Sequence, residues 1–337
     1  MNIDWSKLGF SYIPTKSHIE FEYINGKWND GKIIEGNPFV SISVAASALH
    51  YGQAVFEGLK AYRCLDGEVR VFRDIENAKR LNTSAKYACM PELPEEKFID
   101  AVTRIIKDNI EYLPPYSSNG ALYIRPFMFG SGPVIGITSA DAYKFIILVI
   151  PVGPYYKSGF KGLNAMIFED YDRAAPNGSG RYKLAGNYAA GLMAGKLAKD
   201  KGYSLVLYLD PKEHKYFDEF GSSNFFAITK DGTYVTPSSN SILPSITNKS
   251  LMQVAADIGI KVEKKAVAFS EIDNFVEIGA CGTALVITPV NKIQRGDRVY
   301  TFASDNENGV LFRLYKELTD LQYGRTKDKY GWMRLVE

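Results

Sequence analysis

The segment GRYKLAGNYAAG, residues 180–191, contains a single lysine, Lys183, among small and aromatic neighbours. Most lysines are solvated and take part in no chemistry, because the charged amine is rarely buried. Small neighbours, however, allow other groups to come close to this amine. Lys183 is therefore a candidate amine nucleophile, with an ordinary surface lysine as the alternative.

A carboxylate stands in aromatic surroundings in the segment KYFDEFGSSNFF, where Glu219 follows Phe217 by two residues. In a strand, this spacing places both side chains on one face. A carboxylate drawn among aromatic rings needs a cationic or hydrogen-bonding partner. Glu219 is thus a second candidate for chemistry, and an exposed charge at a strand edge is the alternative.

Two segments could bind an anion through backbone N–H groups. LPSITNKSLMQ places Ile246 and Thr247 at the start of a helix, with Thr247 as the predicted N-cap, and the amides of a helix start attract anions. EIGACGTALVITPV gathers small residues between a predicted helix and a strand, namely Gly279, Gly282, Thr283 and Ala284. An ordinary helix cap and a tight turn are the alternatives.

The segment ALYIRPFMF alternates so that Tyr123 and Arg125 point to the same side of a strand. A tyrosine and an arginine on one face can bind a carboxylate, although a solvated strand face is the alternative. Arg80, in the helical segment NAKRL, has no local feature that separates it from surface arginines.

Together these segments offer an amine, a carboxylate and backbone anion sites. Pyridoxal 5′-phosphate needs these groups, because its aldehyde reacts with a lysine, its pyridine nitrogen pairs with a carboxylate and its phosphate binds at a helix start. The sequence therefore favours an enzyme that uses this cofactor.

Composition narrows the class of protein further. The 337 residues carry 40 basic and 38 acidic side chains, a net charge of +2, and no long basic run, so neither nucleic acid nor an anionic membrane is an expected partner. Three scattered cysteines and three separated histidines match no disulfide framework and no metal-ligand motif, and no metal is expected. No signal segment, membrane-spanning run or nucleotide-binding fingerprint is evident, and a cytoplasmic location is expected.

The elements that must position these residues mix helices and strands, which predicts an α/β fold. Residues 57–72 have the pattern of a β-hairpin, Asp74 is a plausible N-cap for the helix that follows, and a second helix is expected over residues 94–113. Residues 120–129 and 142–151 have the pattern of strands, and the nearly continuous apolar run of the second indicates that it is buried.

The segment PVGPYYKSG, residues 151–159, has two prolines and two glycines and is predicted to be an interdomain linker. It separates a small N-terminal domain, residues 1–150, from a larger domain, residues 160–337, because the chain is long for one core. In the larger domain, strands are expected at 203–210, 216–219, 224–229 and 234–237, and helices from about Asn187, after Thr247 as far as Gly259, from Ser270 and over 311–321.

In this order, the segments resemble the branched-chain amino acid aminotransferases of the fold-type IV pyridoxal phosphate enzymes. The resemblance extends from about Asp4 to Arg325 and rests on seven segments at family-like spacing: HYGQAVFEGLKAYR, LYIRPFMFG, PVGPYYKSG, KLAGNYAAG, LPSITNKS, GTALVITPV and LTDLQYGR. It implies two domains of mixed α/β structure with the cofactor between them, and a homodimer whose active site is shared across the interface.

The resemblance also assigns roles to individual residues. Lys183 corresponds to the Schiff-base lysine and general base, Glu219 to the partner of the pyridine nitrogen, and Tyr188 to the partner of the cofactor's phenolic oxygen. The phosphate contacts correspond to Arg80, Ile246, Thr247 and Thr283, with Leu243 against the ring and Ser222 close by. The substrate contacts correspond to Tyr123, Thr283 and Ala284 for the α-carboxylate, Arg125 for the distal carboxylate of glutamate, Phe56, Gly58 and Tyr155 for the side chain, and Tyr51 and Ile137 from across the dimer interface.

The activity that the resemblance implies is reversible transfer of an amino group between leucine, isoleucine or valine and 2-oxoglutarate. Within the same fold, a D-amino acid aminotransferase and an aminodeoxychorismate lyase are alternatives, against which Tyr188, Tyr123 and the segment FEGLKAY argue. A non-catalytic cofactor-binding protein is a further alternative, which the presence of both Lys183 and Glu219 disfavours.

The chain departs from the family pattern in four places. Residues 184–186 are Leu-Ala-Gly where many members have a glycine pair, and Pro-Ser-Ile precedes Thr247 where Pro-Gly is common. Ser223 stands where members carry Glu or Met, which bears on the polarity of the pocket. No second cysteine forms a CxxC pair with Cys281, so a redox switch of that type is not expected.

Overall fold

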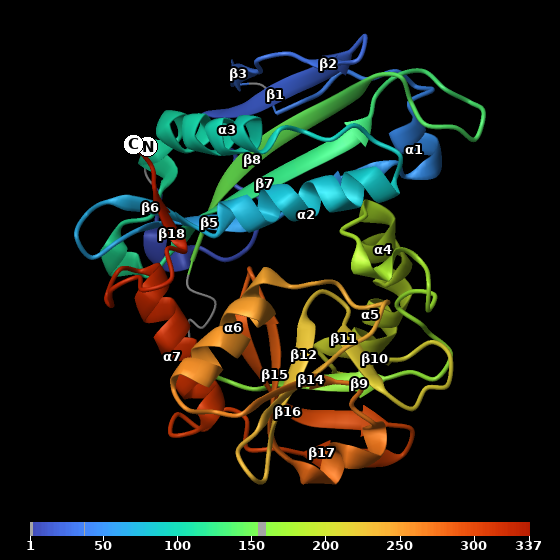
Figure 1. Ribbon diagram of the computed structural model, residues 1–337, viewed down its shortest axis with the longest axis vertical. Helices are drawn as coiled ribbons and strands as arrows, with labels where there is room; N and C mark the ends of the chain where they lie inside the picture. Colours follow the sequence, from blue (N-terminus) through green and yellow to red (C-terminus); the bar gives the residue numbers. More distant parts are fainter. Residues whose placement is uncertain (1–2, 37, 154–159) are drawn as a thin grey trace. The chain divides into compact units, whose positions relative to one another are not determined.

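The computed structural model describes residues 3–36, 38–153 and 160–337. The chain divides into two compact units, and each unit contains a nine-stranded sheet (Figure 1). Unit 1 comprises residues 1–155, 183–186 and 320–337, and unit 2 comprises residues 156–182 and 187–319. The mixed α/β class predicted from the sequence is confirmed.

The sheet of unit 1 is antiparallel. Its strands are β1 (Ser17–Ile24), β2 (Lys27–Trp28), β3 (Lys32–Glu35), β4 (Ala54–Phe56), β5 (Leu59–Arg63), β6 (Val69–Phe72), β7 (Ala121–Gly130), β8 (Tyr143–Val152) and β18 (Met333–Leu335). Their order is β18–β6–β5–β7–β8–β1–β2, while β3 pairs with β1 and β4 pairs with β7. The hairpin predicted for residues 57–72 is confirmed as β5 and β6, in which Ala61 lies opposite Val71.

Helices cover one face of this sheet. The helices of unit 1 are α1 (Ser47–Tyr51), α2 (Asp74–Tyr87) and α3 (Glu95–Asp108), with short 3-10 turns at Trp5–Lys7, Ile110–Tyr112 and Tyr116–Ser118. α2 and α3 lie against the sheet, and Phe98 of α3 packs with Phe145 of β8 in the core (Figure 1). Because side chains alternate along a strand, Leu122 and Ile124 face this core while Tyr123 and Arg125 point to the opposite face.

Two predicted helix boundaries in unit 1 were wrong. Asp74 is the first residue of α2, and the N-cap position belongs to Arg73, which has a left-handed backbone and no capping side-chain bond. The helix expected over 94–113 ends at Asp108 and is followed by a single 3-10 turn. Helix ends depend on local hydrogen bonds that an apolar pattern does not encode.

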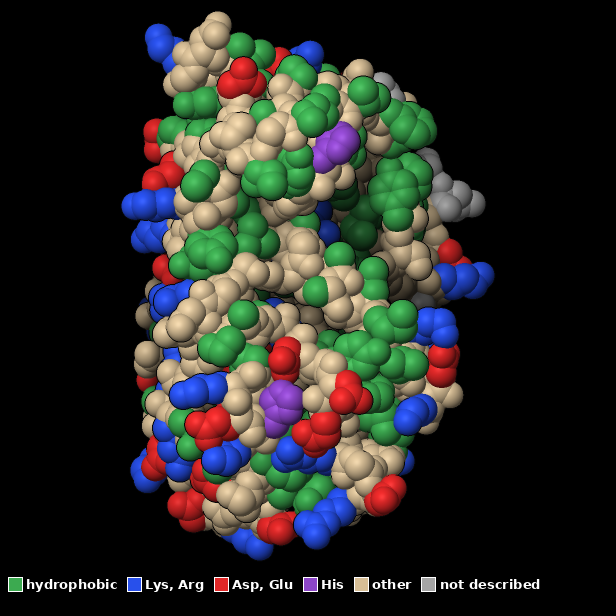
Figure 2. Space-filling model, turned by 90° about the vertical axis from the view of Figure 1, so that its right-hand side faces the viewer, with side chains coloured by type: hydrophobic (Ala, Val, Ile, Leu, Met, Phe, Trp, Pro, Cys, Tyr) green, Lys and Arg blue, Asp and Glu red, His purple; other side chains and the backbone are tan. Residues whose placement is uncertain are grey.

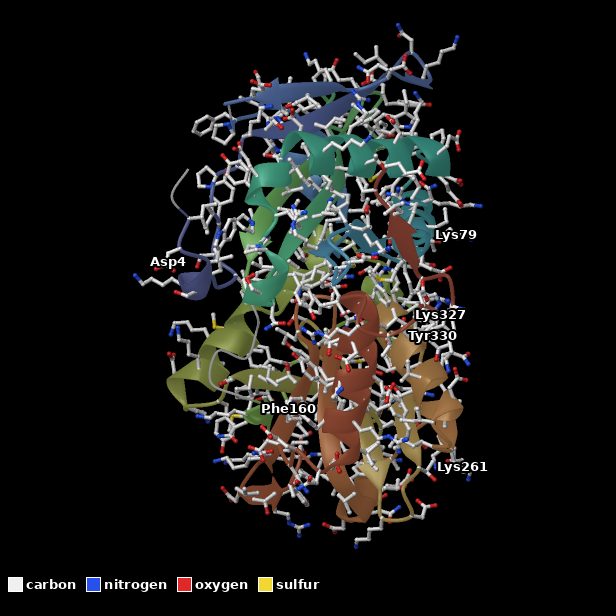
Figure 3. All side chains as sticks on the ribbon, turned by 90° about the vertical axis from the view of Figure 1, so that its left-hand side faces the viewer. Asp4, Lys79, Phe160, Lys261, Lys327 and Tyr330 are labelled. Atoms are coloured by element: carbon white, nitrogen blue, oxygen red, sulfur yellow. The ribbon has the colours of Figure 1, made fainter. Side chains whose placement is uncertain are left out.

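The C-terminal residues complete unit 1. β18 pairs with β6, and Arg334 forms an ion pair with Asp74 at 2.7 Å. Tyr330 stacks on Trp332 with ring centroids 4.0 Å apart, and in Figure 3 Lys327 and Tyr330 lie on the segment that leads into β18. These contacts hold the last residues of the chain on the sheet of the N-terminal domain.

The sheet of unit 2 closes on itself. Its strands are β9 (Leu163–Ile167), β10 (Leu205–Leu209), β11 (Phe217–Phe220), β12 (Asn224–Thr229), β13 (Tyr234–Pro237), β14 (Val262–Lys265), β15 (Phe275–Gly282), β16 (Val286–Arg295) and β17 (Arg298–Thr301). The order is β11–β10–β9–β16–β15–β12–β13–β14, and β11 also pairs with β12. This additional pairing joins six strands into a ring, whose aromatic core includes Phe217 stacked on Phe225 at 4.6 Å.

Four helices accompany these strands: α4 (Ala185–Ala190), α5 (Leu192–Asp200), α6 (Ile246–Asp257) and α7 (Val310–Gln322), with 3-10 turns at Ser179–Arg181 and Phe269–Asn274. α5 buries Ala194 and Ala198 against β9 and β10. The ring of Phe160, labelled in Figure 3, packs against Phe312 of α7 with centroids 5.3 Å apart. The first residues of α4 and the last of α7 are grouped with unit 1.

Three predictions for this part of the chain were wrong. Ser245, not Thr247, is the N-cap of α6, and its side chain accepts a hydrogen bond from the N–H of Asn248 at 3.1 Å. The helix expected from Ser270 is a 3-10 turn over Phe269–Asn274. The small residues around 279–284 join two strands rather than a helix and a strand, because β15 continues to Gly282.

The two units differ from the predicted division of the chain. Residues 154–159, which include Tyr155 and most of the predicted linker, lie outside the described residues. Two segments that the prediction assigned to the larger domain, 183–186 and 320–337, group with unit 1. A single boundary at one linker assigns all later residues to the second domain, so it does not predict that later segments pack on the first sheet.

Candidate active site

Lys183 is held on the sheet of unit 1 through its backbone. Its N–H donates to the hydroxyl of Ser84 in α2 at 2.9 Å, and its carbonyl accepts from the N–H of Phe56 at 3.1 Å. An isolated bridge joins Val55 to Leu184. The Nζ atom of Lys183 lies 4.9 Å from the centroid of the Phe56 ring. The backbone of Lys183 is thus anchored by β4 and α2, and its side chain is half-buried, unlike that of an ordinary surface lysine.

Arg80, another predicted cofactor contact, forms a buried ion pair in the same unit. Its Nε and Nη2 atoms donate to the two oxygens of Glu57 at 2.7 and 2.8 Å. Glu57 is completely buried and also accepts from Asn77 at 2.7 Å. Burial would raise the pKa of Glu57, but the Arg80 guanidinium and then the Lys183 ammonium lower it below its ordinary value. The carboxylate is therefore a fixed negative charge beside two cations.

Tyr123 and Arg125 share one face of β7, as the alternation predicted. Arg125 donates from Nη2 to the Tyr123 hydroxyl at 2.9 Å, and its guanidinium carbon lies 4.8 Å from the Phe56 ring centroid. Within the described residues, the buried Nε of Arg125 has no hydrogen-bond partner. A buried donor without a partner costs free energy, so this arrangement is suited to receiving an anionic ligand.

Gly58 keeps space beside the tyrosine. A Cβ atom added at Gly58 would collide with the hydroxyl of Tyr123. Any larger residue at position 58 would therefore displace Tyr123 or its hydroxyl. The structure thus brings together Phe56, Gly58, Tyr123 and Arg125, four of the predicted substrate contacts, in unit 1.

Tyr51 is the last residue of α1, and Ile137 lies in the neighbouring surface loop between β7 and β8. The Tyr51 hydroxyl donates to the carbonyl of Ile135, and Ala46 bridges to Pro133. Exposed apolar side chains gather on α1 and the loops beside it, and Ile137 is 93% exposed. Figure 2 shows hydrophobic side chains on the face of unit 1 that carries α1. We name this set the α1 patch: Val44, Leu49, Tyr51, Ile135 and Ile137.

Glu219 in unit 2 has the cationic partner that its aromatic surroundings require. Arg173 approaches its Oε1 atom at 2.5 Å, and the N–H of Leu243 donates to the same oxygen at 2.8 Å. Asn224 donates to Oε2 at 3.2 Å and to the carbonyl of Leu243 at 2.9 Å. Arg173 is held in turn by the carbonyls of Gly180 and Ser241. This network surrounds the buried Glu219 carboxylate with a cation and two N–H donors and fixes Leu243 beside it.

The remaining predicted contacts of unit 2 lie on turns and helix ends. Ser222 is in the turn between β11 and β12, and Thr283 and Ala284 are in the turn between β15 and β16. These turns are neighbours, because Asn224 pairs with Cys281 across the strands that lead into them. Ile246 and Thr247 are buried in the first turn of α6, and Tyr188 is half-buried in α4.

Sequence reasoning missed Glu57, Asn77, Arg173 and Asn224, which hold the predicted residues in place. Glu57 is in the segment FEGLKAY, which was considered for its pattern but not for its carboxylate. The aromatic surroundings of Glu219 predict a cationic partner, but Arg173 lies 46 residues away in a segment without regular structure. Only the register of β11 and β12 indicates Asn224, since it lies directly opposite Glu219.

Within the part of the chain that the structure describes, no group of three histidine, cysteine or acidic side chains is placed to hold a metal ion. In the same residues, no helix combines the length and the apolar character needed to cross a membrane.

Comparison with known proteins identifies the family. Residues 54–293 match the model of the class IV aminotransferases. The chain is 44% identical to the branched-chain-amino-acid aminotransferase of Haemophilus influenzae, over 100% of this chain and 99% of that protein. It is also 44% identical to the enzyme of the same name from Helicobacter pylori, over 98% and 97% of the two chains.

Solved structures agree with this assignment. The branched-chain amino acid aminotransferase from Escherichia coli matches 96% of this chain and 100% of its own, with a TM-score of 0.77 and 28% identity. The chain therefore belongs to the class IV aminotransferases and is a transferase. The resemblance to the branched-chain amino acid aminotransferases found in the sequence is confirmed along the whole chain.

A buried lysine lies beside the predicted substrate contacts of unit 1. Lys60 of β5 is paired with Tyr123 of β7, so both side chains share the face that carries Arg125. Lys60 is 9% exposed, and burial lowers its pKa to about 8. Near neutral pH, the folded protein must therefore bear the cost of a buried ammonium group.

This burial predicts a pH dependence of stability. Below about pH 8 Lys60 is protonated in both the folded and the unfolded chain, and above about pH 10.5 it is neutral in both. Between these values the unfolded chain binds more protons, so the folded state gains stability as pH rises. The free energy of unfolding of the wild type, relative to Lys60→Met, should increase by about 3 kcal/mol over this range. Denaturant titrations at a series of pH values measure it, and a constant difference would contradict the assignment.

Proposed function

We propose that this protein is a branched-chain amino acid aminotransferase. It uses pyridoxal 5′-phosphate to transfer an amino group reversibly between L-leucine, L-isoleucine or L-valine and 2-oxoglutarate, which yields the 2-oxo acid and L-glutamate. The observation that carries this proposal is Lys183, whose backbone is anchored by Ser84 and Phe56 and whose amine lies 4.9 Å from the centroid of the Phe56 ring. The activity named for full-length relatives at 44% identity supports the substrate class.

The side chains and backbone groups of the proposed site match the functional groups of this cofactor. Unit 1 offers the Lys183 amine and the Arg80 guanidinium, and unit 2 offers the ionised Glu219 and the first turn of α6. An amine, a carboxylate and anion-binding groups are what an aldehyde, a pyridine nitrogen and a phosphate require. The residues that we propose hold the cofactor are Arg80, Lys183, Tyr188, Glu219, Ser222, Leu243, Ile246, Thr247 and Thr283.

When bound, the cofactor supplies an aldehyde that takes the amino group and a ring that withdraws electrons from the substrate Cα. The Nζ atom of Lys183 would accept the Cα proton and deliver it to the cofactor carbon that receives the amino group, while its backbone contacts with β4 and α2 hold the segment in place. Glu219, ionised by Arg173 and the Leu243 N–H, holds a proton at the ring nitrogen.

The substrate pocket must accept both an apolar side chain and a distal carboxylate. Tyr123, with the amides of Thr283 and Ala284, binds the α-carboxylate, while Phe56, Gly58 and Tyr155 line the space for the side chain. The Nε of Arg125, buried without a hydrogen-bond partner among the described residues, supports a role in binding the distal carboxylate of glutamate. The apolar isobutyl group of leucine forms no ion pair with Arg125.

We further propose a cytoplasmic homodimer, in which Tyr51 and Ile137 contribute to the partner's active site. The α1 patch supports this proposal, because contiguous exposed apolar residues typically mark an interface. Three free cysteines, Cys64, Cys89 and Cys281, are consistent with a reducing compartment.

Replacement of the lysine tests the proposed function. Lys183→Ala should lose transamination by at least about a thousandfold, because it removes both the amine that links to the cofactor and the general base. Borohydride reduction followed by peptide mass mapping should find the cofactor on residue 183 of the wild type only. Lys196→Ala, which changes an exposed lysine of α5, is the matched control. A Lys183→Ala protein that still transaminates at the wild-type rate would refute the proposal.

Arg125→Ala should separate the two half-reactions. Loss of the partner of a buried carboxylate typically costs about 3–5 kcal/mol, which corresponds to a loss of roughly two to three decades or more for glutamate. Leucine has no distal carboxylate and should be affected much less. Single-turnover rates measured separately with each amino acid provide the comparison. Equal losses would show that Arg125 has only a structural role.

The dimer is tested at the α1 patch. Ile137→Asp places a charge where we propose that a second subunit packs, and an unpaired buried charge costs several kcal/mol. The dissociation constant of the dimer should therefore rise at least about a hundredfold, as measured by sedimentation velocity. Val299→Asp changes an exposed apolar residue of β17 and should leave the assembly unchanged. A dimer of unaltered affinity in Ile137→Asp would exclude this face.

A further inference from the structure

We propose that His214 is a positioning residue: its imidazole binds Asp172 and thereby holds Arg173, the next residue, against Glu219. His214 lies in the turn between β10 and β11, and all four residues belong to unit 2. The inference rests on the proposed function, because Glu219 affects the reaction only as the partner of the cofactor's ring nitrogen.

Arg173 stands in a segment that side chains must hold in place. Residues 168–178 follow β9 and form turns and bends without a helix or strand, so no regular backbone pairing fixes them. The side chain of Arg173 is nevertheless buried and reaches Glu219 at 2.5 Å. Ordering such a segment costs conformational entropy, which contacts elsewhere along it must offset.

The turn that carries His214 is itself well fixed. The Asp210 carboxylate accepts three backbone N–H groups of this turn at 2.7–2.8 Å, and the His214 N–H donates to the Asp210 carbonyl at 3.0 Å. His214 has a left-handed backbone with a φ of 50°, which few residues other than glycine adopt. The turn leads directly into β11, the strand of Glu219, so the imidazole is presented from a fixed position.

The imidazole contacts the Arg173 segment through both of its nitrogens. Nε2 of His214 lies 2.8 Å from Oδ1 of Asp172, and Nδ1 lies 3.4 Å from Oε2 of Glu169. Arg295 donates to both oxygens of Glu169, at 2.6 and 3.2 Å, and to the carbonyl of His214 at 3.1 Å. An isolated exposed ion pair contributes little, but this network attaches two residues of the segment to the turn at once.

The network requires the charged imidazole. A neutral imidazole has one N–H, whereas the imidazolium has one for each carboxylate. The hydrogen bond to Asp172 raises the pKa of His214 above its ordinary value, although burial opposes this effect. The other charged groups close to it are Arg295 and, in its own turn, Asp210, Glu213 and Lys215. Because the folded pKa is raised, the contact is fully present below about pH 6.5 and is lost as pH rises through the folded value.

Hydrogen exchange of the full-length protein, followed by mass spectrometry, tests the contact without reference to activity. His214→Asn removes the imidazole with a residue that tolerates a left-handed backbone, and Asp172→Asn removes its carboxylate partner. At pH 6 each variant should speed exchange over residues 168–178 roughly three- to tenfold. The double variant should add little, since both changes break one contact. Glu213→Gln breaks an ion pair of the same turn and, as the matched control, should change nothing.

The pH dependence separates this role from a merely structural one. After correction for intrinsic exchange rates, the difference between wild type and His214→Asn should vanish as pH rises through the His214 midpoint. An imidazole that only packed would give the same difference at every pH. Imidazole NMR measures the midpoint, because the chain has three histidines and the His214 signal is the one missing in His214→Asn. Asp172→Asn should lower this midpoint.

Single-turnover kinetics connect the contact with the reaction. At pH 6 and saturating leucine, the limiting rate of His214→Asn should fall about threefold or more, because a displaced Arg173 no longer holds Glu219. The leucine concentration that gives half this rate should stay within about twofold, since Glu219 pairs with the cofactor and not with the substrate. The loss should disappear at alkaline pH, as the exchange difference does.

The outcomes distinguish this inference from the proposed function. Faster exchange and slower turnover in both variants, each lost at alkaline pH, support His214 as the positioning residue. Unchanged exchange, a difference that is independent of pH, or unchanged turnover overturns it while the proposed function stands. A wild-type protein that shows the exchange effects but transfers no amino group overturns the proposed function, and with it the role of His214 in the reaction.

Discussion

The hydrogen bond from the Phe56 N–H to the Lys183 carbonyl is the contact on which the candidate site depends. Together with the bridge between Val55 and Leu184, it makes a short segment of the second half of the chain part of the first sheet. The residues that flank this segment belong to unit 2. A flexible lysine is therefore anchored by its backbone, and its amine lies over the ring of Phe56.

In both units a buried carboxylate is paired with an arginine. Glu57 is paired with Arg80 and Glu219 with Arg173, and each carboxylate also accepts an amide or backbone hydrogen bond. An unpaired carboxylate at either position would be neutralised by a raised pKa, because burial disfavours its charged form. The arginines thus preserve the ionised carboxylates that the proposed chemistry requires. The positions of these charges follow from packing that holds both partners rigidly.

Because side chains alternate along a strand, the two faces of the sheet in unit 1 carry different kinds of residue. One face buries Leu122 and Ile124 under α2 and α3, and the other presents Tyr123 and Arg125. Buried polar groups on this second face cost free energy unless they form hydrogen bonds with one another or with a ligand. A Cβ atom at Gly58 would collide with the Tyr123 hydroxyl, so this face leaves no room for a larger residue at that position.

The sequence by itself determined the family, the class of fold and the shared face of Tyr123 and Arg125, because these follow from motif order and from the two-residue period of a strand. It also singled out Lys183 and Glu219 as the candidates for chemistry. Only the tertiary structure decided that 183–186 and 320–337 belong to the first unit, that Ser245 caps α6, and that Glu57 and Arg173 partner Arg80 and Glu219. The reason is physical. Strand pairing and ion pairs between distant segments depend on how the whole chain packs. A local sequence pattern does not indicate which distant residue pairs with a buried charge.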